Sequence, residues 1–290
     1  MAVWRRFRLN SPAVNYARWV PARPSRATVS DQLVSEDLQL SDHRIVLCGA
    51  NGTLGRAIAR KLADEGAHLA LLGRNIDSLR NVVEGLPAST SGHPHLIAHC
   101  DLGQQESIDR AIETAQKDLG GIDVFISAAG ASQGGIFWEL DDAAWQRNLE
   151  VKLFGTLRIL RTVTARMAQS KRGRVVVIAG NSAEKPDPRM LPGAAANAAL
   201  LAVVRGLATE LKPLGVSLNA VNPGPVRSPR LDALMKAEAE RTGVTPEQAT
   251  TAFLERTGVR ELVTPEDVAT YVAFFASSLS SHLTGTSITV

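Results

Sequence analysis

Cys48-Gly49-Ala50-Asn51-Gly52-Thr53-Leu54-Gly55 is the stretch of sequence that decides the fold. It follows a short apolar run, Arg44–Cys48, and it opens an amphipathic stretch at residues 53–65. Glycines at such a turn permit a tight bend and let the backbone approach a pyrophosphate, which then lies at a helix N-terminus. A loop with three glycines is a weak signal alone, but its place between a predicted strand and a predicted helix favours a dinucleotide-binding turn.

Short apolar runs alternate with helical patterns from residue 43 to the end of the chain. The runs that we interpret as strands are 44–48, 68–72, 95–99, 123–127, 174–179, 216–221 and 286–290. The amphipathic stretches between them are 53–65, 76–84, 106–118, 145–169 and 197–212. This alternation predicts an α/β fold, with a doubly wound parallel sheet, helices on both faces and right-handed crossovers. We assign one domain to residues 41–290.

Residues 1–40 are predicted to be a basic, disordered leader outside this domain. The first 30 residues hold six arginines and no acidic residue, and because the whole chain has a net charge of +3, the remaining residues carry −3. A mildly acidic domain argues against nucleic-acid binding. A segment that contains Arg and Ser but no acid is also typical of an organelle transit peptide, and this alternative stays open beside the expected cytoplasmic location.

The composition excludes several other classes of protein. Cys48 and Cys100 are too few for a disulfide framework or a metal knuckle, and both follow apolar runs, so we expect buried free thiols. The six histidines show no metal-ligand spacing, and we expect no metal site. The longest apolar stretch, Leu191–Val204, is shorter than the ~20 residues of a membrane-spanning helix and predicts a packed helix without membrane association.

The second predicted strand ends in Leu72-Gly73-Arg74-Asn75. A site that prefers NAD would have a carboxylate here for the ribose 2′-hydroxyl, whereas an arginine can pair with the 2′-phosphate of NADP. The alternative is an ordinary solvated arginine. We predict NADP(H) as the cofactor.

Together with three further motifs, these features resemble the short-chain dehydrogenase/reductase family over about residues 43–290. Asp101-Leu102 follows the third predicted strand, where the family contacts adenine. Ser127-Ala128-Ala129-Gly130 follows the fourth and is similar to the family's Asn-Asn-Ala-Gly. Pro223-Gly224-Pro225-Val226-Arg227-Ser228 follows the sixth and is similar to the Pro-Gly-x-x-x-Thr segment near the nicotinamide.

The resemblance implies a Rossmann-type sheet with the strand order 3-2-1-4-5-6-7. It also implies a set of cofactor-binding residues drawn from the motifs above. These are Gly49, Asn51, Gly52, Thr53, Leu54, Gly55, Arg74, Asn75, Asp101, Leu102, Ala128, Ala129, Gly130, Pro223, Gly224 and Val226.

The positions of the family's catalytic residues depart from its pattern. Members usually carry a Ser, a Tyr-x-x-x-Lys motif and an Asn in the preceding helix. In this chain the Ser position falls at Gly180, the Tyr at Gly193, the Lys at Asn197 and the helical Asn at Lys152. Neither of the two tyrosines is followed by a lysine four residues later. The chain is therefore identified as an atypical member that lacks the usual proton donor.

A Pro-Asp-Pro-Arg loop, Pro186–Arg189, follows the fifth predicted strand. Its two prolines restrict the backbone on either side of Asp187. By the geometry of the family, this loop borders the nicotinamide pocket and Lys152 projects into the same space. The two residues could form a plain ion pair, or Asp187 could face the substrate as an acid or counter-ion. The loop is similar to that of an atypical branch of the family that includes fungal indole-alkaloid imine reductases.

We predict an NADP(H)-dependent oxidoreductase that acts on a small-molecule imine, iminium or carbonyl, with Lys152 and Asp187 as catalytic residues. Reduction of an iminium needs no proton on oxygen, so the Asp187 carboxylate would stabilise the cation. For a carbonyl, Lys152 would be the general acid if burial lowers its pKa. Two alternatives stay open: a non-redox enzyme, such as a cyclase, isomerase or lyase, and a cofactor-binding protein without turnover.

Residues 227–262 interrupt the strand pattern and predict a helical lid over the substrate. Trp138 and Trp145 are predicted to pack in the core in preference to stacking on a substrate. The helical patterns at 145–169 and 197–212 are long, and the second is more apolar than one sheet face requires. Because the family pairs these helices across two-fold axes, we expect a homodimer or homotetramer.

Overall fold

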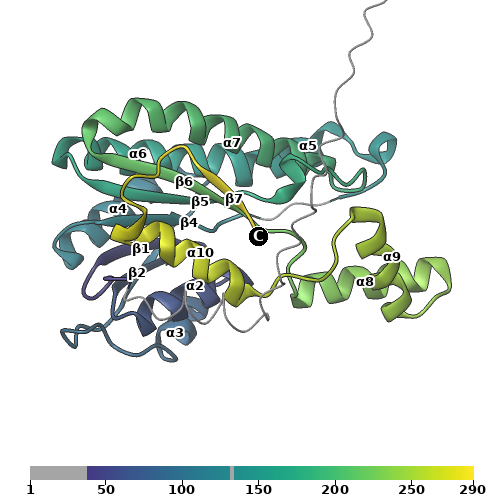
Figure 1. The fold of residues 1–290 in the computed structure, drawn as a ribbon, viewed down its shortest axis with the longest axis horizontal. Coiled ribbons are helices and arrows are strands. Elements are labelled where there is room, and N and C mark those ends of the chain that lie inside the picture. Colours follow the sequence, from purple (N-terminus) through teal and green to yellow (C-terminus); the bar gives the residue numbers. More distant parts are fainter. Residues whose placement is uncertain (1–37, 131–133) are drawn as a thin grey trace, which may run out of the picture. The chain divides into compact units, whose positions relative to one another are not determined.

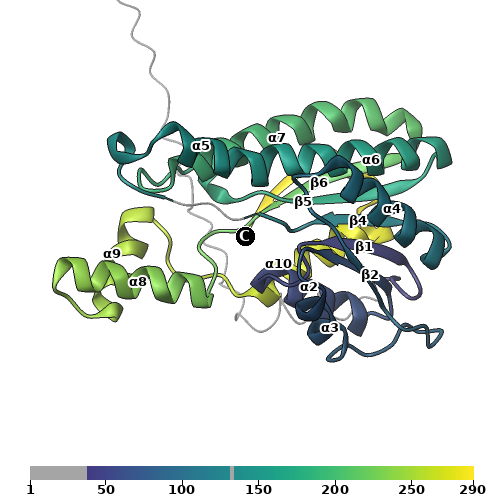
Figure 2. The ribbon, with the colours of Figure 1, turned by 180° about the vertical axis from the view of Figure 1, so that it is seen from behind.

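The computed structural model describes residues 38–130 and 134–290. In this part of the chain, seven parallel strands form one sheet in the order β3-β2-β1-β4-β5-β6-β7. Helices cover both faces of the sheet, as the two opposite views in Figures 1 and 2 show. The predicted Rossmann-type architecture and its strand order are confirmed.

The strands are short and central to the core. Their bounds are β1 Arg44–Cys48, β2 His68–Gly73, β3 Leu96–His99, β4 Val124–Ser127, β5 Gly173–Ile178, β6 Val216–Asn222 and β7 Ser287–Thr289. Every predicted strand end lies within one residue of the observed end. The agreement follows from the near-continuous apolar runs of strands that are buried on both faces.

The helices lie between these strands and after β6. Their bounds are α2 Thr53–Asp64, α3 Ile76–Val83, α4 Gln105–Leu119, α5 Asp142–Leu149, α6 Gly155–Ser170, α7 Leu191–Leu211, α8 Pro229–Thr242, α9 Pro246–Thr257 and α10 Pro265–Ala276.

Two of the predicted helices differ from the observed ones. The stretch at 145–169 is not one regular helix, because a π-helical turn, Glu150–Phe154, separates α5 from α6. The stretch at 197–212 begins six residues earlier, at Leu191, where Pro192 occupies the first turn and has no N–H to leave unpaired.

Apolar side chains form a core layer on each face of the sheet. One layer joins the strands to α4, α6 and α7, and the other joins them to α2, α3 and α10. Leu38 and Leu40 are buried in the second layer, although the predicted domain boundary at residue 41 leaves them in the leader. The rest of the predicted leader, residues 1–37, falls outside the described residues.

Leu191–Leu214, which includes α7, is the one helical stretch within the described ranges that is long and apolar enough to cross a membrane. Half of that stretch is buried inside the protein, with Leu200, Leu201 and Val204 in the core layer that also contains α4 and α6. It is therefore explained as a packed core helix, as predicted. Cys48 and Cys100 are buried free thiols, which also agrees with the prediction.

Helices α8 and α9 form a separate projection beside the end of the sheet where the chain terminates, at the lower right of Figure 1. A parallel bridge between Val226 and Val263 ties the two ends of this insertion together. The Arg227 N–H donates to the Val263 carbonyl at 2.9 Å, and the Val263 N–H donates to the Pro225 carbonyl at 3.0 Å. The insertion thus leaves and rejoins the domain at one closed base.

Candidate functional site

A cavity of about 380 Å³ opens at the carboxyl ends of β1, β2 and β4. Strand order reverses between β1 and β4, and open α/β sheets bind their ligands at such a switch point. The lining residues are Cys48, Gly49, Asn51, Gly52, Gly73, Arg74, Cys100, Asp101, Leu102, Gly103, Ala128, Ala129, Gly130, Glu150 and Val151.

The glycine-rich turn forms the floor of this cavity. Gly49 has a φ of +83°, and a Cβ there would lie 2.5 Å from the backbone nitrogen of Ala129, so only glycine fits. Gly52 is the N-cap of α2 and no side chain caps that helix, which leaves its first N–H groups available. Gly55 packs against the backbone of Gly49 and Ala50. An uncapped helix N-terminus behind a close-fitting backbone turn fits a pyrophosphate.

Arg74 and Asp101 lie on the side of the cavity formed by β2 and β3. Arg74 is exposed, and within the described ranges its side chain makes no hydrogen bond or ion pair. The Asp101 carboxylate accepts from the Gly103 N–H at 3.0 Å, which fixes its orientation. Asn75 uses its side-chain oxygen to cap α3, accepting from the Ser78 N–H at 2.9 Å.

The structure gathers nine of the sixteen predicted cofactor residues around the cavity, namely Gly49, Asn51, Gly52, Arg74, Asp101, Leu102, Ala128, Ala129 and Gly130. The other seven lie outside its lining: Thr53, Leu54 and Gly55 in α2, Asn75 at the start of α3, and Pro223, Gly224 and Val226 after β6. Sequence reasoning missed Cys48, Gly73, Cys100, Gly103, Glu150 and Val151. The first four are next to predicted residues in the sequence, and the last two directly precede Lys152. Their position beside predicted residues is the signal that could have identified them.

Lys152 lies in the π-helical turn between α5 and α6. Its Nζ donates to the Ala179 carbonyl at 3.0 Å, just beyond the end of β5. Its aliphatic stem crosses Gly130, where an added Cβ would lie 3.3 Å from the Lys152 Cδ. Burial, aided by the positive charge of Arg230, lowers the pKa of Lys152 to about 8. Turns of this kind often occur at functional sites, since they displace one side chain from the regular helical position.

Asp187 is held by partners other than Lys152. Its carboxylate accepts from the Arg189 N–H at 2.9 Å and from the Arg256 guanidinium of α9 at 3.0 Å. Only 11% of its side chain is exposed. The ion pair between Lys152 and Asp187, one of the two alternatives from the sequence, is not formed, because each side chain is engaged elsewhere. Arg256 had no signal in the sequence, since it lies 69 residues away in the chain.

Gly180, Gly193 and Asn197 are brought together where β5 meets the start of α7. A Cβ on Gly180 would lie 2.6 Å from the Asn197 Nδ2, so the asparagine occupies the space beside the glycine. That nitrogen donates to the Ser182 hydroxyl at 2.9 Å. The Asn197 Oδ1 is buried and finds no hydrogen-bond partner in the part of the chain that the structure describes.

The two tryptophans near α5 differ from each other. Trp138 is 83% exposed, so the prediction that it packs in the core is wrong: the 3₁₀ turn Phe137–Glu139 leaves it in solvent. Trp145 is half-buried and meets the Phe137 ring edge-on, with the ring centroids 6.3 Å apart. Over the described ranges, no group of three or more His, Cys, Asp or Glu residues could hold a metal ion.

Comparison with known proteins gives the family. Residues 49–290 match the family model described as Enoyl-(Acyl carrier protein) reductase. The chain is 30% identical over 245 residues to the short-chain reductase protein NovJ of Streptomyces niveus, covering 84% of this chain and 91% of that protein. The chain belongs to the short-chain dehydrogenase/reductase family. It is also similar to 2,3-dihydro-2,3-dihydroxybenzoate dehydrogenase of Bacillus subtilis (strain 168), at 29% identity over 82% of this chain and 90% of that one.

Solved structures agree with this membership. An actinorhodin polyketide ketoreductase with NADPH is 26% identical, with a TM-score of 0.77 over 86% of this chain and 96% of that one. Levodione reductase, at 22% identity, shares the fold with a TM-score of 0.80 over 87% and 97% of the two chains. The short-chain dehydrogenase/reductase assignment, with its oxidoreductase and nucleotide-binding scaffold, is confirmed.

Proposed function

We propose that this chain is an NADP(H)-dependent reductase of the short-chain dehydrogenase/reductase family whose proton donor is Lys152. The observation that carries the proposal is the placement of the Lys152 ammonium 3.0 Å from the Ala179 carbonyl, one residue before Gly180. By resemblance, Gly180 is the position of the family's catalytic serine. The lysine and the reacting end of the cofactor would therefore meet at the end of β5.

The choice of NADP(H) rests on Arg74. Structures of this fold are known with NADPH, as in L-sorbose reductase from Gluconobacter frateurii, and with NAD⁺, as in xylitol dehydrogenase, so the fold does not decide between them. An arginine that lines the cavity and has no partner among the described residues favours a 2′-phosphate, to which a guanidinium can make paired hydrogen bonds. The uncapped start of α2 would hold the pyrophosphate. When bound, the cofactor supplies the hydride.

Lys152 would supply the proton for a carbonyl substrate. As hydride adds to the carbonyl carbon, negative charge develops on oxygen, and a donor within hydrogen-bond distance lowers the barrier. A lysine with a pKa of about 8 is mostly protonated at neutral pH, yet releases its proton more readily than an ordinary lysine. The acceptor oxygen takes that proton, and the neutral amine is re-protonated from water.

The residues at the other family positions favour a site with different functional residues over a site that has lost its function. Asn197 fills the space beside Gly180 and binds Ser182, so a serine at 180 would require the asparagine side chain to shift. We interpret this as an atypical member without the Ser, Tyr and Lys of the family. Asp187, on its Pro-Asp-Pro-Arg loop, is proposed as the counter-ion for a cationic substrate such as an iminium, with Arg256 as the partner that the substrate replaces.

The test is NADPH consumption with a panel of carbonyls and imines, measured on the unchanged enzyme and on Lys152→Met. We expect turnover of carbonyls to fall about 10²–10³-fold in the variant, the range for loss of a general acid, with the Kd for NADPH unchanged. Full carbonyl reduction by Lys152→Met would contradict the proposal. NADPH binding without consumption across the panel would favour a cofactor-binding protein, and product formation without consumption would favour a non-redox enzyme.

A further inference from the structure

A second and larger cavity, of about 550 Å³, lies at the amino ends of β5 and β6. Because the strands are parallel, this end of the sheet is opposite the end that carries the cofactor cavity. The lining comes from the segments at the amino ends of β1, β4, β5, β6 and β7, and none of its residues takes part in the function proposed above. It therefore calls for a separate explanation.

The lining of this cavity is basic. Arg172, Arg174 and Lys212 carry full positive charges, and His43 and His282 are also present. Asp123 is the one carboxylate among the residues that line it. The net charge of the lining thus depends on whether the Asp123 carboxylate pairs with these cations or with a residue outside the cavity.

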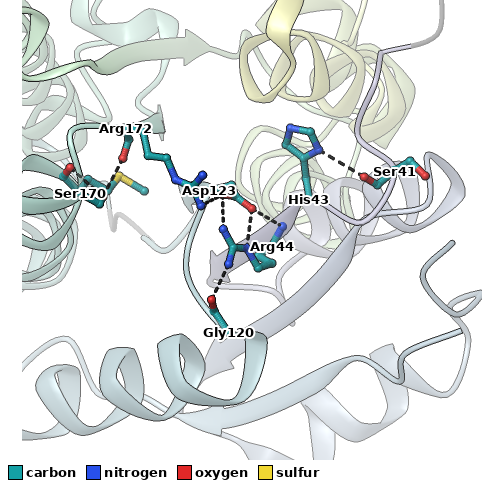
Figure 3. Close-up of polar contacts among 8 residues, drawn as sticks. Ser41, His43, Arg44, Gly120, Asp123, Ser170 and Arg172 are labelled. Atoms are coloured by element: carbon teal, nitrogen blue, oxygen red, sulfur yellow. Dashed lines mark hydrogen bonds and ion pairs between the residues drawn. The ribbon is translucent and has the colours of Figure 1, made fainter. Parts of the chain in front are cut away.

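Asp123 is already neutralised from outside the cavity by Arg44. The Arg44 Nε donates to Oδ2 at 2.7 Å and its Nη2 donates to Oδ1 at 2.6 Å, an arrangement visible in Figure 3. Although burial opposes it, these hydrogen bonds hold the pKa of Asp123 below its usual value. Arg172 adds a longer contact of 3.2 Å to Oδ1.

Arg174 and Lys212 have no carboxylate in direct contact. Within the described ranges, neither side chain makes a hydrogen bond or an ion pair. Arg174 is half-buried at the start of β5, and burial lowers its pKa, with only partial compensation from Asp123. A half-buried guanidinium without a carboxylate is unfavourable unless an anion or water satisfies it. The hydroxyl groups of Ser217 and Ser281 on the same lining add donors.

We propose that this cavity is a binding site for a small ligand that carries phosphate groups. A guanidinium and an ammonium beside hydroxyl donors are the combination with which proteins bind phosphate oxygens. The volume lies within the ~300–1,000 Å³ range of small-molecule pockets, which favours a small metabolite over an extended polyanion. The site would act independently of the reaction at the other end of the sheet.

Lys212 gives a readout specific to this cavity. The protein is acetylated with an activated ester, with and without inorganic pyrophosphate, and each lysine is followed by mass spectrometry. We expect pyrophosphate to slow modification of Lys212 at least fivefold, while Lys236, which is exposed on α8, is unaffected. Slower modification of Lys152 alone would place the anion at the cofactor end and overturn the proposal, as would equal rates at Lys212 with and without pyrophosphate.

Variants of the cavity residues test the proposed phosphate site through its affinity for pyrophosphate. Arg174→Gln should weaken the pyrophosphate protection of Lys212 about tenfold, the size expected for a charge-assisted hydrogen bond. Arg161→Gln, on the exposed surface of α6, is the matched control and should leave the protection unchanged. If Arg174→Gln does not fold, calorimetric titration of Lys212→Gln with pyrophosphate replaces it. An unchanged affinity in the variant used, or equal protection by citrate, would overturn a phosphate-specific site.

Discussion

At the scale of single residues, the proposed site contains two cations in contrasting environments. Arg74 is exposed on the cavity wall, so its pairing with a ligand involves little desolvation. Lys152 is half-buried and donates to the Ala179 carbonyl. Because burial destabilises the charged ammonium, the pKa of Lys152 is lowered. The first residue suits binding, and the second suits proton transfer near neutral pH.

Replacement of Arg74 by Ala should weaken NADPH binding and leave NADH binding unchanged. Loss of charge-assisted hydrogen bonds to a 2′-phosphate corresponds to about 1.5–3 kcal/mol, or roughly a 10–100-fold higher Kd. Calorimetric titration of both cofactors against both proteins measures this. Arg110→Ala, at an exposed position on α4, is the control. Equal affinities for the two cofactors in the unchanged protein would refute the NADP(H) preference.

The kcat/KM for carbonyl reduction should fall as the pH rises through about 8. In the proposed mechanism the protonated form of Lys152 is the donor. Its pKa is about 8, and above that pH the protonated fraction falls tenfold per pH unit. A profile of kcat/KM against pH reports this ionisation in the free enzyme. Lys152→Gln should remove the alkaline limb together with most of the activity, whereas Lys185→Gln, an exposed lysine of the nearby loop, should keep both. A profile that is flat from pH 7 to 9.5 would exclude Lys152 as the acid.

At the scale of elements, the Pro-Asp-Pro-Arg loop is linked to the insertion by an ion pair. Asp187 on the loop pairs with Arg256 near the end of α9, and α9 begins with a complete capping box at Thr245 and Gln248. A well-capped helix on a closed base can move as a unit, and the pair joins it to the rim of the site. The same carboxylate therefore has two candidate partners, the lid and a cationic substrate.

Two variants separate these roles of Asp187. Asp187→Asn should retain NADPH binding but lower turnover of an iminium substrate about 10²–10³-fold, as expected for loss of one electrostatic contact. Arg256→Gln frees the carboxylate, so it should keep or raise that turnover if Asp187 is the counter-ion. A matched loss in both variants would mean instead that Asp187 serves only to hold α9. Steady-state rates with one imine and one carbonyl decide between the two outcomes.

The elements also show what the sequence predicts and what it does not. The strands and the glycine turn were predictable because they depend on local patterns: apolar runs buried on both faces, and Gly49 at a positive φ. The break of the predicted 145–169 helix by a π-helical turn was not, because nothing in the local pattern marks the extra residue. The contact between Asp187 and Arg256 could not be predicted either, because the tertiary path of the insertion brings Arg256 near.

At the scale of the whole molecule, both ends of the parallel sheet carry cavities of different chemistry. The carboxyl end has a backbone cradle with a single exposed arginine, and the amino end has a cluster of cations around a neutralised carboxylate. Between them lie two continuous core layers, so that the two sites share a rigid support. A small-molecule enzyme is the proposal that fits this arrangement best.

Assembly is the last property expected of the whole molecule. Helices α5, α6 and α7 lie along one side of the sheet, and the π-helical turn exposes Val151 and Phe154, the latter by 46%. Burial of such side chains against a second copy is favourable by ~25 cal/mol per Å² of apolar surface, and closed two-fold assemblies are the commonest outcome. Light scattering should therefore give two or four times the chain mass of 31.0 kDa. Phe154→Glu should shift the protein toward the monomer, whereas Leu234→Glu, at an exposed apolar position on α8, should not. A monomer of the unchanged protein at micromolar concentration would refute the expectation. In that case no second copy could help to position Lys152, which lies two residues from Phe154.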